Sequence, residues 1–191
     1  MIARSEHWGS RSEHMKVLQV PFSFYPDAAG GTEVYVNALA TALNSSDDFA
    51  VAIAAPAKAT ATYKHNGLQV YRYAVTEGTL ALEELYGDGD PVACDGFKAI
   101  LERFQPDLVH FHALTSGVSL RLIRAAKARN CSVVFTYHTP TVSCVRGTLL
   151  RWGTEICDGR LDTKRCAQCR LQGLGLNRFA SQVCGSIAPA V

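Results

Sequence analysis

The stretch "VLQVPFSFYPDAAGGTEVYVNALATAL", residues 17–43, decides the fold class because it leads from a buried strand into a helix. The strand is an apolar run from Lys16 to Phe22. Pro26 and the pair Gly30-Gly31 then interrupt the pattern. From Thr32 to Leu43, apolar residues return at helical spacing, at Val36, Leu39, Ala40 and Leu43. The stretch therefore predicts a strand, a glycine turn and a helix.

The same alternation of strands and helices continues along the chain. We predict further strands at Phe49–Pro56, Leu68–Tyr73, Leu108–His112 and Cys131–His138, and helices at Pro91–Phe104 and from Ser116 to about Arg129, with Asn130 as its C-cap. The strand at Leu68–Tyr73 alternates in polarity, which places it nearer an edge, and residues 57–67 are interpreted as a loop. Nearly all-apolar strands between helices indicate a parallel sheet covered on both faces. The predicted fold class is α/β, a Rossmann-like doubly wound parallel sheet in a single domain.

Composition restricts the classes of function. The chain has 191 residues, with 19 Lys and Arg against 17 acidic residues, so its net charge of +2 gives no global footprint for nucleic acid. No apolar run approaches the roughly 18 residues that a membrane span needs. Residues 1–14 lack the apolar core of a secretory signal, and we interpret them as a disordered extension or cloning remnant. Seven cysteines, an odd number, without a signal favour a cytoplasmic protein.

Several polar or glycine-rich segments follow the predicted strands, where ligands bind in open parallel sheets. Gly30 and Gly31 would let a ligand approach the backbone, and the helix N-terminus after them favours an anion such as phosphate. The alternative is a tight connection in which glycine supplies a positive φ and Thr32 or Glu33 caps the helix. The absence of a G-x-G-x-x-G pattern disfavours a dinucleotide cofactor, and with it an oxidoreductase.

Three histidines lie at the same predicted edge of the sheet. His138 ends the last strand, where its ring can hydrogen-bond a ligand. His110 and His112 are two residues apart on a strand and so share one face. The alternatives are a structural role for His138 and hydrogen bonds from His110 and His112 to neighbouring backbone. We expect His138 and the glycine turn to converge on one pocket.

The ordered segments "MKVLQV", "P-x-x-x-G-G-T-E-x-Y-V-x-x-L-A-x-x-L", "PDLVHFH" and "VVFTYHTP" together resemble the N-terminal domain of family 4 (group 1) retaining glycosyltransferases of the GT-B fold. The resemblance runs from about Met15 to the C-terminus. It implies transfer of a sugar from a nucleotide-sugar to a saccharide or lipid-linked acceptor, with retention of anomeric configuration. A peripheral association with a membrane is compatible with the latter acceptor.

The resemblance also implies roles for individual residues. Gly30 and Gly31 would approach the donor diphosphate and sugar, and His138 would hydrogen-bond the donor sugar near the reacting centre. Thr32, Glu33 and His112 are weaker substrate-binding candidates. No cofactor is needed for catalysis if backbone amides and cationic side chains stabilise the phosphate charge. The C-terminal donor-binding domain, with its E-x7-E acidic pair, has no counterpart here, so we predict that this chain alone is inactive.

Residues 139–175 form a Cys-rich insertion without clear periodicity. Its thiols, Cys144, Cys157, Cys166 and Cys169, are separated by 12, 8 and 2 residues. A terminal C-x-x-C with two further thiols suits a structural zinc site of four thiolates. Two disulfides, a redox C-x-x-C and unliganded cysteines remain alternatives. The other cysteines, Cys94, Cys131 and Cys184, are interpreted as small buried apolar residues.

The insertion is also basic. From Cys144 to Arg170 there are six Lys or Arg against three acidic residues. Arg146 and Arg151 are therefore candidates to contact a phosphorylated or lipid-linked acceptor, although a solvated loop surface explains the charge equally well. The rival function is a non-catalytic module whose basic Cys-rich loop binds a protein or nucleic-acid partner. Salt-sensitive binding through this loop would favour that rival.

Overall fold

The computed structural model describes residues 14–27, 30–78, 88–138, 140, 143–144 and 146–186. The chain divides into two compact units, Met1–Thr136 and Tyr137–Val191. The predicted N-terminal extension, apart from His14, lies outside the described residues, as do Thr139 and Pro189.

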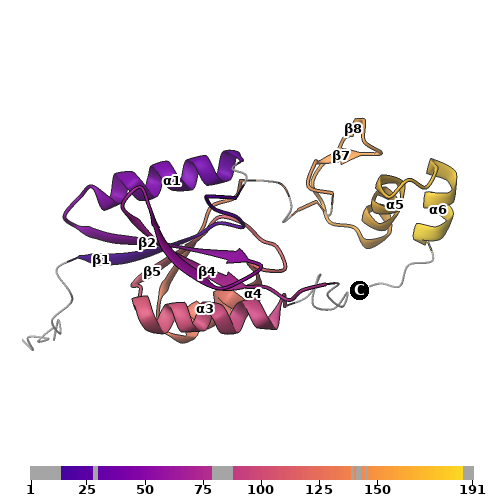
Figure 1. Cartoon of the computed structure of the whole chain (residues 1–191). Helices are drawn as coiled ribbons and strands as arrows, with labels where there is room; N and C mark the ends of the chain where they lie inside the picture. Colours follow the sequence, from indigo (N-terminus) through magenta and orange to yellow (C-terminus); the bar gives the residue numbers. More distant parts are fainter. Residues whose placement is uncertain are drawn as a thin grey trace, which may run out of the picture. The chain divides into compact units, whose positions relative to one another are not determined.

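The first unit contains a six-stranded sheet with the order β3-β4-β2-β1-β5-β6 (Figure 1). Its strands are β1 (Met15–Val20), β2 (Phe49–Ala57), β3 (Ala61–His65), β4 (Leu68–Ala74), β5 (Leu108–Phe111) and β6 (Ser132–Phe135). Every neighbouring pair is parallel except β3 and β4. The predicted α/β, Rossmann-like architecture is confirmed.

Helices cover both faces of this sheet (Figure 1). Helix α1 (Gly31–Asn44) lies on one face, and α3 (Pro91–Phe104) and α4 (Leu120–Ala128) lie on the other. Each face has its own apolar cluster. The α1 face includes Val17, Val36, Ala40 and Ile53. The opposite face includes Leu18, Phe97, Leu101, Val109 and Leu122. Burial of these side chains supplies most of the driving force for folding.

The interpretation of residues 57–67 as a loop is wrong, because β3 lies there and pairs antiparallel with β4. The hairpin turns at Asn66 and Gly67, whose φ angles of 49° and 82° are those of a tight two-residue connection. Leu68–Ala74 is consequently the second strand from this edge and β3 is the outermost. The β3 side chains are mostly exposed, so the strand carries little of the apolar signal on which the prediction relied.

Two element boundaries also differ at the opposite side of the sheet. Helix α4 begins at Leu120 after Ser119, four residues later than the predicted cap Ser116. Asn130, the predicted C-cap, instead follows the cap residue Arg129 and adopts a left-handed φ of 58°. Strand β6 ends at Phe135, three residues before His138, and its side chains are largely exposed because it is an edge strand of the described sheet.

The second unit is built from short elements, of which the sequence pattern predicts only the last, a helix within residues 176–191 that ends at Gly185 and Pro189. Strands β7 (Leu150–Arg151) and β8 (Glu155–Ile156) form a small hairpin, and α5 (Thr163–Gly173) and α6 (Arg178–Ser186) follow it. Asp162 caps α5 by accepting a hydrogen bond from the Arg165 amide at 2.6 Å. Helices α5 and α6 pack closely, since a Cβ at Gly185 would lie 2.5 Å from Gln168 Cγ.

Candidate functional site

The strand order places one candidate site between β1 and β5. The chain builds outward from β1 through β2 to one side and through β5 to the other, so the direction of winding reverses between these two neighbours. Helix α1, after β1, and helix α4, after β5, cover opposite faces. Such a reversal opens a crevice at the carboxyl ends of the strands. Both Gly30-Gly31 and His112 follow strands that end there.

Gly30 is the N-cap of α1, and its amide is already occupied. The Glu33 side chain, which is fully buried, accepts a hydrogen bond from Gly30 N through Oε2 at 2.7 Å. This is one half of a capping box, because glycine has no side chain that could accept a hydrogen bond from the Glu33 amide. The other carboxylate oxygen, Oε1, has no hydrogen-bond partner among the described residues. Glu33 therefore caps the glycine turn, as one of its predicted roles requires.

The two glycines are not explained by backbone conformation. Gly30 has an ordinary extended conformation with φ of −100°, and Gly31 is the first residue of the helix. Neither adopts the positive φ that the alternative explanation assumed. A Cβ at Gly30 would lie 3.1 Å from Glu33 Oε2, so close packing against Glu33 explains a glycine at this position. A Cβ at Gly31 would meet no atom of the described residues within 4 Å.

His110 on β5 and His112 directly after this strand lie beside β1. His112 is only 2% exposed, and its Nε2 lies 2.6 Å from Oε1 of Gln19 on β1. The Gln19 Nε2 atom is buried without a hydrogen-bond partner among the described residues. His110 Nε2 lies 2.6 Å from Thr136 Oγ1, and the two histidine rings are 4.0 Å apart. Both of these bonds go to side chains. Tyr35 on α1 meets His112 edge-on at 5.9 Å, an exposed aromatic that the sequence reasoning missed.

Arg72 fixes the segment between β1 and the glycine turn. Its buried guanidinium donates to the carbonyl oxygens of Phe24 and Pro56, both at 2.9 Å, and forms an ion pair with Asp27. Arginine's fixed fork of donors suits such simultaneous contacts. Arg72 is therefore a positioning residue for this side of the site. Sequence reasoning missed it because an arginine within an alternating strand predicts an outward-facing side chain.

His138, the predicted catalytic residue, belongs to the second unit. Its side chain is partly exposed, and it follows Tyr137, the first residue of that unit. Its convergence with the glycine turn stays a prediction. Thr32, at the second position of α1, is partly exposed beside the open amides of the first helical turn.

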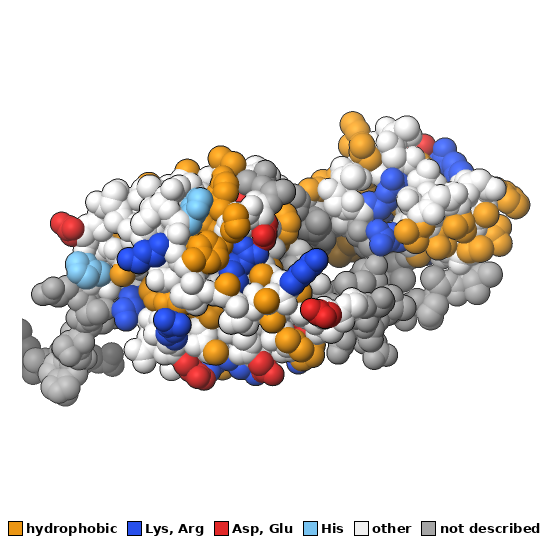
Figure 2. All heavy atoms as spheres, in the orientation of Figure 1, with side chains coloured by type: hydrophobic (Ala, Val, Ile, Leu, Met, Phe, Trp, Pro, Cys, Tyr) orange, Lys and Arg blue, Asp and Glu red, His pale blue; other side chains and the backbone are white. Residues whose placement is uncertain are grey.

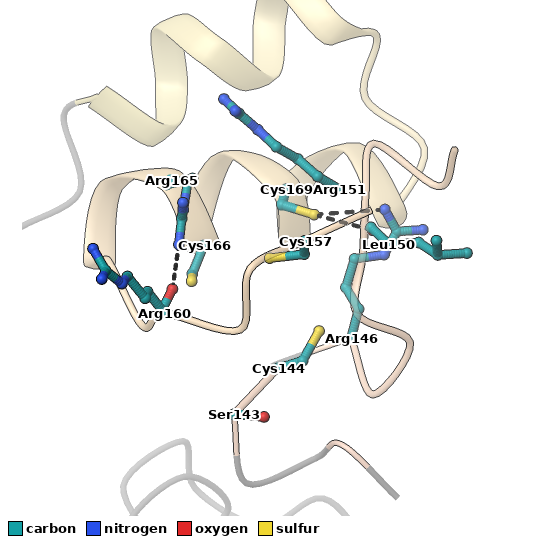
Figure 3. A pocket seen from close by; sticks show the side chains of 10 residues that line it. All are labelled: Ser143, Cys144, Arg146, Leu150, Arg151, Cys157, Arg160, Arg165, Cys166 and Cys169. Atoms are coloured by element: carbon teal, nitrogen blue, oxygen red, sulfur yellow. Dashed lines mark hydrogen bonds between the residues drawn. The ribbon is translucent and has the colours of Figure 1, made fainter. Parts of the chain in front are cut away.

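The second unit holds a separate small cavity. All four cysteines of the insertion line it, and Figure 3 shows their sulfur atoms around the same space, together with arginine side chains. The cavity has a volume of about 20 Å³. No three or more His, Cys, Asp or Glu side chains within the described segments already stand at metal-binding spacing. Zinc binding by these residues therefore stays a prediction.

The surroundings of Cys144 in this cavity favour its thiolate form. Burial opposes ionisation of Cys144, but hydrogen bonds from the backbone amides of four following residues hold the pKa of its thiol below the ordinary value. Those donors are Leu149, Thr148, Arg146 and Gly147. The Arg146 guanidinium donates to Gln172 Oε1 at 2.9 Å and lies 3.7 Å from the Cys169 sulfur. Arg146 is thus directed into the insertion, and its contact with an acceptor stays a prediction.

Of the remaining cysteines, two behave as predicted. Cys94 and Cys131 are buried in the first unit, at 2% and 5% exposure, and burial raises the pKa of both thiols. Cys184 on α6 is exposed, so its interpretation as a buried apolar residue is wrong.

Comparison with known proteins decides the family. A family described as the glycosyl transferase 4-like domain matches residues 30–184, which include the glycine turn, both histidines of β5, His138 and the insertion. The chain belongs to this family. Its fold and its family together make it a GT-B domain of the N-terminal, family 4 type, as the sequence resemblance implied.

Solved structures show how far the likeness of this glycosyl transferase 4-like domain extends. Sucrose-phosphate synthase from Thermosynechococcus elongatus matches with a TM-score of 0.51 and 20% identity, over 68% of this chain and 34% of that one. UDP-GlcNAc 2-epimerase from Neisseria meningitidis, solved with UDP-GlcNAc bound, matches with a TM-score of 0.45 and 16% identity. The match covers 63% of this chain and 31% of that one. No curated protein matches the domain. The domain spans about one third of the length of these solved chains.

Among the helices of the described segments, none combines the length and apolar character that crossing a bilayer requires.

Proposed function

We propose that this domain is the acceptor-side half of a retaining glycosyltransferase, and that it acts when joined to a donor-binding half. The reaction transfers a sugar from a nucleotide-sugar to a saccharide or lipid-linked acceptor. Membership of the glycosyl transferase 4-like family supports the transferase class. The position of the glycine turn at the reversal of the sheet supports the choice of site.

Gly31 is the observation that carries the proposal. A side chain there would strain no backbone and would meet no atom of the described residues within 4 Å. Neither conformation nor internal packing therefore requires glycine at this position. An approaching ligand does require it, because a Cβ would stand in front of the helix N-terminus. The amides of Gly31 and Thr32 belong to the first turn of α1, where no intrahelical acceptor exists.

These groups suit the chemistry of glycosyl transfer from a nucleotide-sugar. As the bond to the leaving diphosphate breaks, negative charge grows on phosphate oxygens, and preorganised amides stabilise it. In the proposal His138 donates a hydrogen bond to the donor sugar, and His112 and Gln19 support the floor of the site. The first turn of α1 already holds the Glu33 carboxylate, which weakens its attraction for a second anion. We therefore expect the domain alone to bind a nucleotide-sugar weakly and to lack turnover.

The rival function has less support from the structure. A basic module for nucleic acid uses cations that reach phosphates, but Arg165 forms an ion pair with Asp158, and the Arg146 guanidinium donates to Gln172 within the insertion. The proposal therefore includes no nucleic-acid partner. It keeps a cytoplasmic location and a peripheral contact with membrane for a lipid-linked acceptor.

Amide NMR on the chain tests the proposed site. Titration with a panel of nucleotide-sugars is expected to shift the signals of Gly30, Gly31 and Thr32. Gly31→Ala is expected to weaken this binding at least about tenfold, because its methyl group occupies the ligand's approach. Ala38→Ser, which also adds one heavy atom at an exposed position of α1, provides the matched control and is expected to bind like the wild type.

Two outcomes would contradict the proposal. One is the absence of any shift at these amides at millimolar nucleotide-sugar, and the other is a shift that Gly31→Ala leaves unchanged. Robust sugar transfer by the chain alone would overturn its role as one half of an enzyme. Once the donor-binding half is supplied, NMR of the product is expected to show the donor's anomeric configuration.

A further inference from the structure

The second unit lacks the internal stabilisation that the first unit has. Both apolar clusters of the described residues lie in the first unit. In the described part of the second unit, Trp152 is the one buried large hydrophobic side chain. Figure 2 shows hydrophobic side chains at the surface there instead. Phe179 is 76% exposed and Ile156 is 92% exposed. A compact unit of this size without a core normally needs a disulfide or metal cross-link.

The insertion brings four thiols to one place from three segments. Cys144 lies in the turn before β7, Cys157 follows β8 directly, and Cys166 and Cys169 lie one turn apart on α5. The hairpin closes this arrangement, since the Cys157 amide donates to the Leu149 carbonyl at 2.8 Å. All four thiols border the cavity of about 20 Å³ (Figure 3). That volume admits about one water-sized sphere, so a single ion fits and an organic ligand does not.

The chemistry of the lining selects the ion. Four thiolates in a roughly tetrahedral arrangement are the ligand set of structural zinc. Zinc with four thiolates carries a net charge of −2, which is costly to hold in a small cavity without compensation. Arginines line the same cavity, and Arg146 approaches the Cys169 sulfur to 3.7 Å. Such outer partners orient ligands and balance the charge of a metal site.

We propose that Cys144, Cys157, Cys166 and Cys169 bind one structural Zn²⁺ that holds the second unit together. A Zn–S distance of about 2.3 Å places tetrahedral sulfurs about 3.8 Å from one another. Since the described residues hold no ready-made group of three or more ligands at metal-binding spacing, the ion must draw the sulfurs inward across the cavity. Each thiol that ligates releases its proton, so one Zn²⁺ displaces up to about four protons.

Metal analysis of the full chain tests the proposal. Protein produced without supplemental zinc and purified under anaerobic conditions is expected to carry one equivalent of zinc by mass spectrometry. Cys166→Ser and Cys169→Ser are each expected to lower this at least about tenfold. Cys184→Ser is the matched control, because it removes an exposed thiol of the same unit that does not line the cavity. Less than about a tenth of an equivalent in the wild type would overturn the proposal, as would loss of zinc in Cys184→Ser.

Thiol counting separates zinc from disulfides. After denaturation with a chelator but no reductant, the zinc-bound chain is expected to show all seven cysteines as reactive thiols. Two disulfides in the insertion would leave three, and that result would overturn the proposal.

A measurement on the wild-type chain covers the case in which the serine variants fail to fold. The fluorescence of Trp152, whose ring lies under Arg151 and Arg178, reports on this unit. In a Trp8→Phe background, chelator is expected to shift the Trp152 emission to longer wavelength and added zinc to restore it. An emission spectrum that chelator leaves unchanged would contradict a structural ion.

Discussion

The first unit buries two apolar clusters on opposite faces of a sheet, whereas the second unit buries one tryptophan and gathers four thiols around a small cavity. In the first, side chains far apart in sequence meet because strands and helices each turn an apolar face inward. In the second, polar caps, a hairpin and close packing of α5 on α6 supply order locally. Burial stabilises the first unit, whereas in our proposal a zinc ion supplies the corresponding stabilisation in the second.

Removal of zinc is expected to have the largest effect, and to destabilise only the second unit. Chelator should raise the rate of amide hydrogen exchange throughout residues 143–186 toward the unfolded rate, because the described part of that unit has no apolar core that would keep it folded without the ion. Exchange within β1, β2 and β5 should stay slow. Hydrogen exchange followed by mass spectrometry checks this. Equal loss of protection in the sheet would show that the two units fold as one.

Phe97→Ala is the opposite test, directed at the first unit. Phe97 is fully buried and packs against Tyr73 and Phe111, each at 6.0 Å between ring centroids. Its truncation should lower the free energy of unfolding by about 3–5 kcal/mol in urea denaturation. Zinc content should not change. Val92→Ala, at an exposed position of the same helix, is the control and should cost less than about 0.5 kcal/mol.

Asp90→Asn tests how much a buried, hydrogen-bonded carboxylate contributes to the stability of the first unit. The buried Asp90 caps α3, accepting from the amides of Val92 and Thr76 at 2.9 and 2.6 Å. Burial opposes its ionisation, but these bonds together hold the pKa of Asp90 below its usual value. The substitution should cost about 1–3 kcal/mol at pH 7 in urea denaturation. Asp95→Asn, exposed on the same helix, should have a much smaller effect.

The difference in free energy of unfolding between wild type and Asp90→Asn depends on pH, and the sign of the Asp90 pKa shift decides how. The folded-state pKa of Asp90 is depressed, so its stabilisation is fully present above the unfolded value of about 3.9. It is lost as the pH falls through the folded pKa. The gap between wild type and Asp90→Asn should therefore be constant from about pH 5 to 7 and shrink below about pH 4. A gap that widens in acid would contradict this assignment.

The sequence predicted the first unit well because its elements bury apolar faces with a clear period. Helix α3 was predicted with its observed bounds, Pro91–Phe104, since an apolar stripe and two prolines define it. Strand β3 was missed because its outward side chains are exposed and polar. Helix α5 was missed because none of its residues is buried, which leaves no periodic signal to read.

Prediction of the candidate site was uneven for similar physical reasons. Gly30, Gly31 and His112 follow strand ends, which a pattern of apolar runs can locate. Arg72 and Gln19 lie within strands, and their contacts depend on neighbours up to 93 residues away, so no local pattern shows them. The four cysteines were recognisable by spacing alone, yet only folding shows that they share one cavity.

Gly31→Ala should change the free energy of unfolding least. The sign of that change tells whether a ligand or internal packing explains the glycine. Alanine loses less conformational entropy on folding than glycine, and its methyl group at the first position of α1 meets no atom within 4 Å in the part of the chain that the structure describes. The variant should therefore be more stable by about 0.4–1 kcal/mol in urea denaturation, while it binds nucleotide-sugars more weakly. If Gly31→Ala instead lost stability, internal packing would explain the glycine and the case for a ligand there would fail. Gain of stability with loss of binding would show that the first unit gives up some stability to keep the mouth of its crevice open.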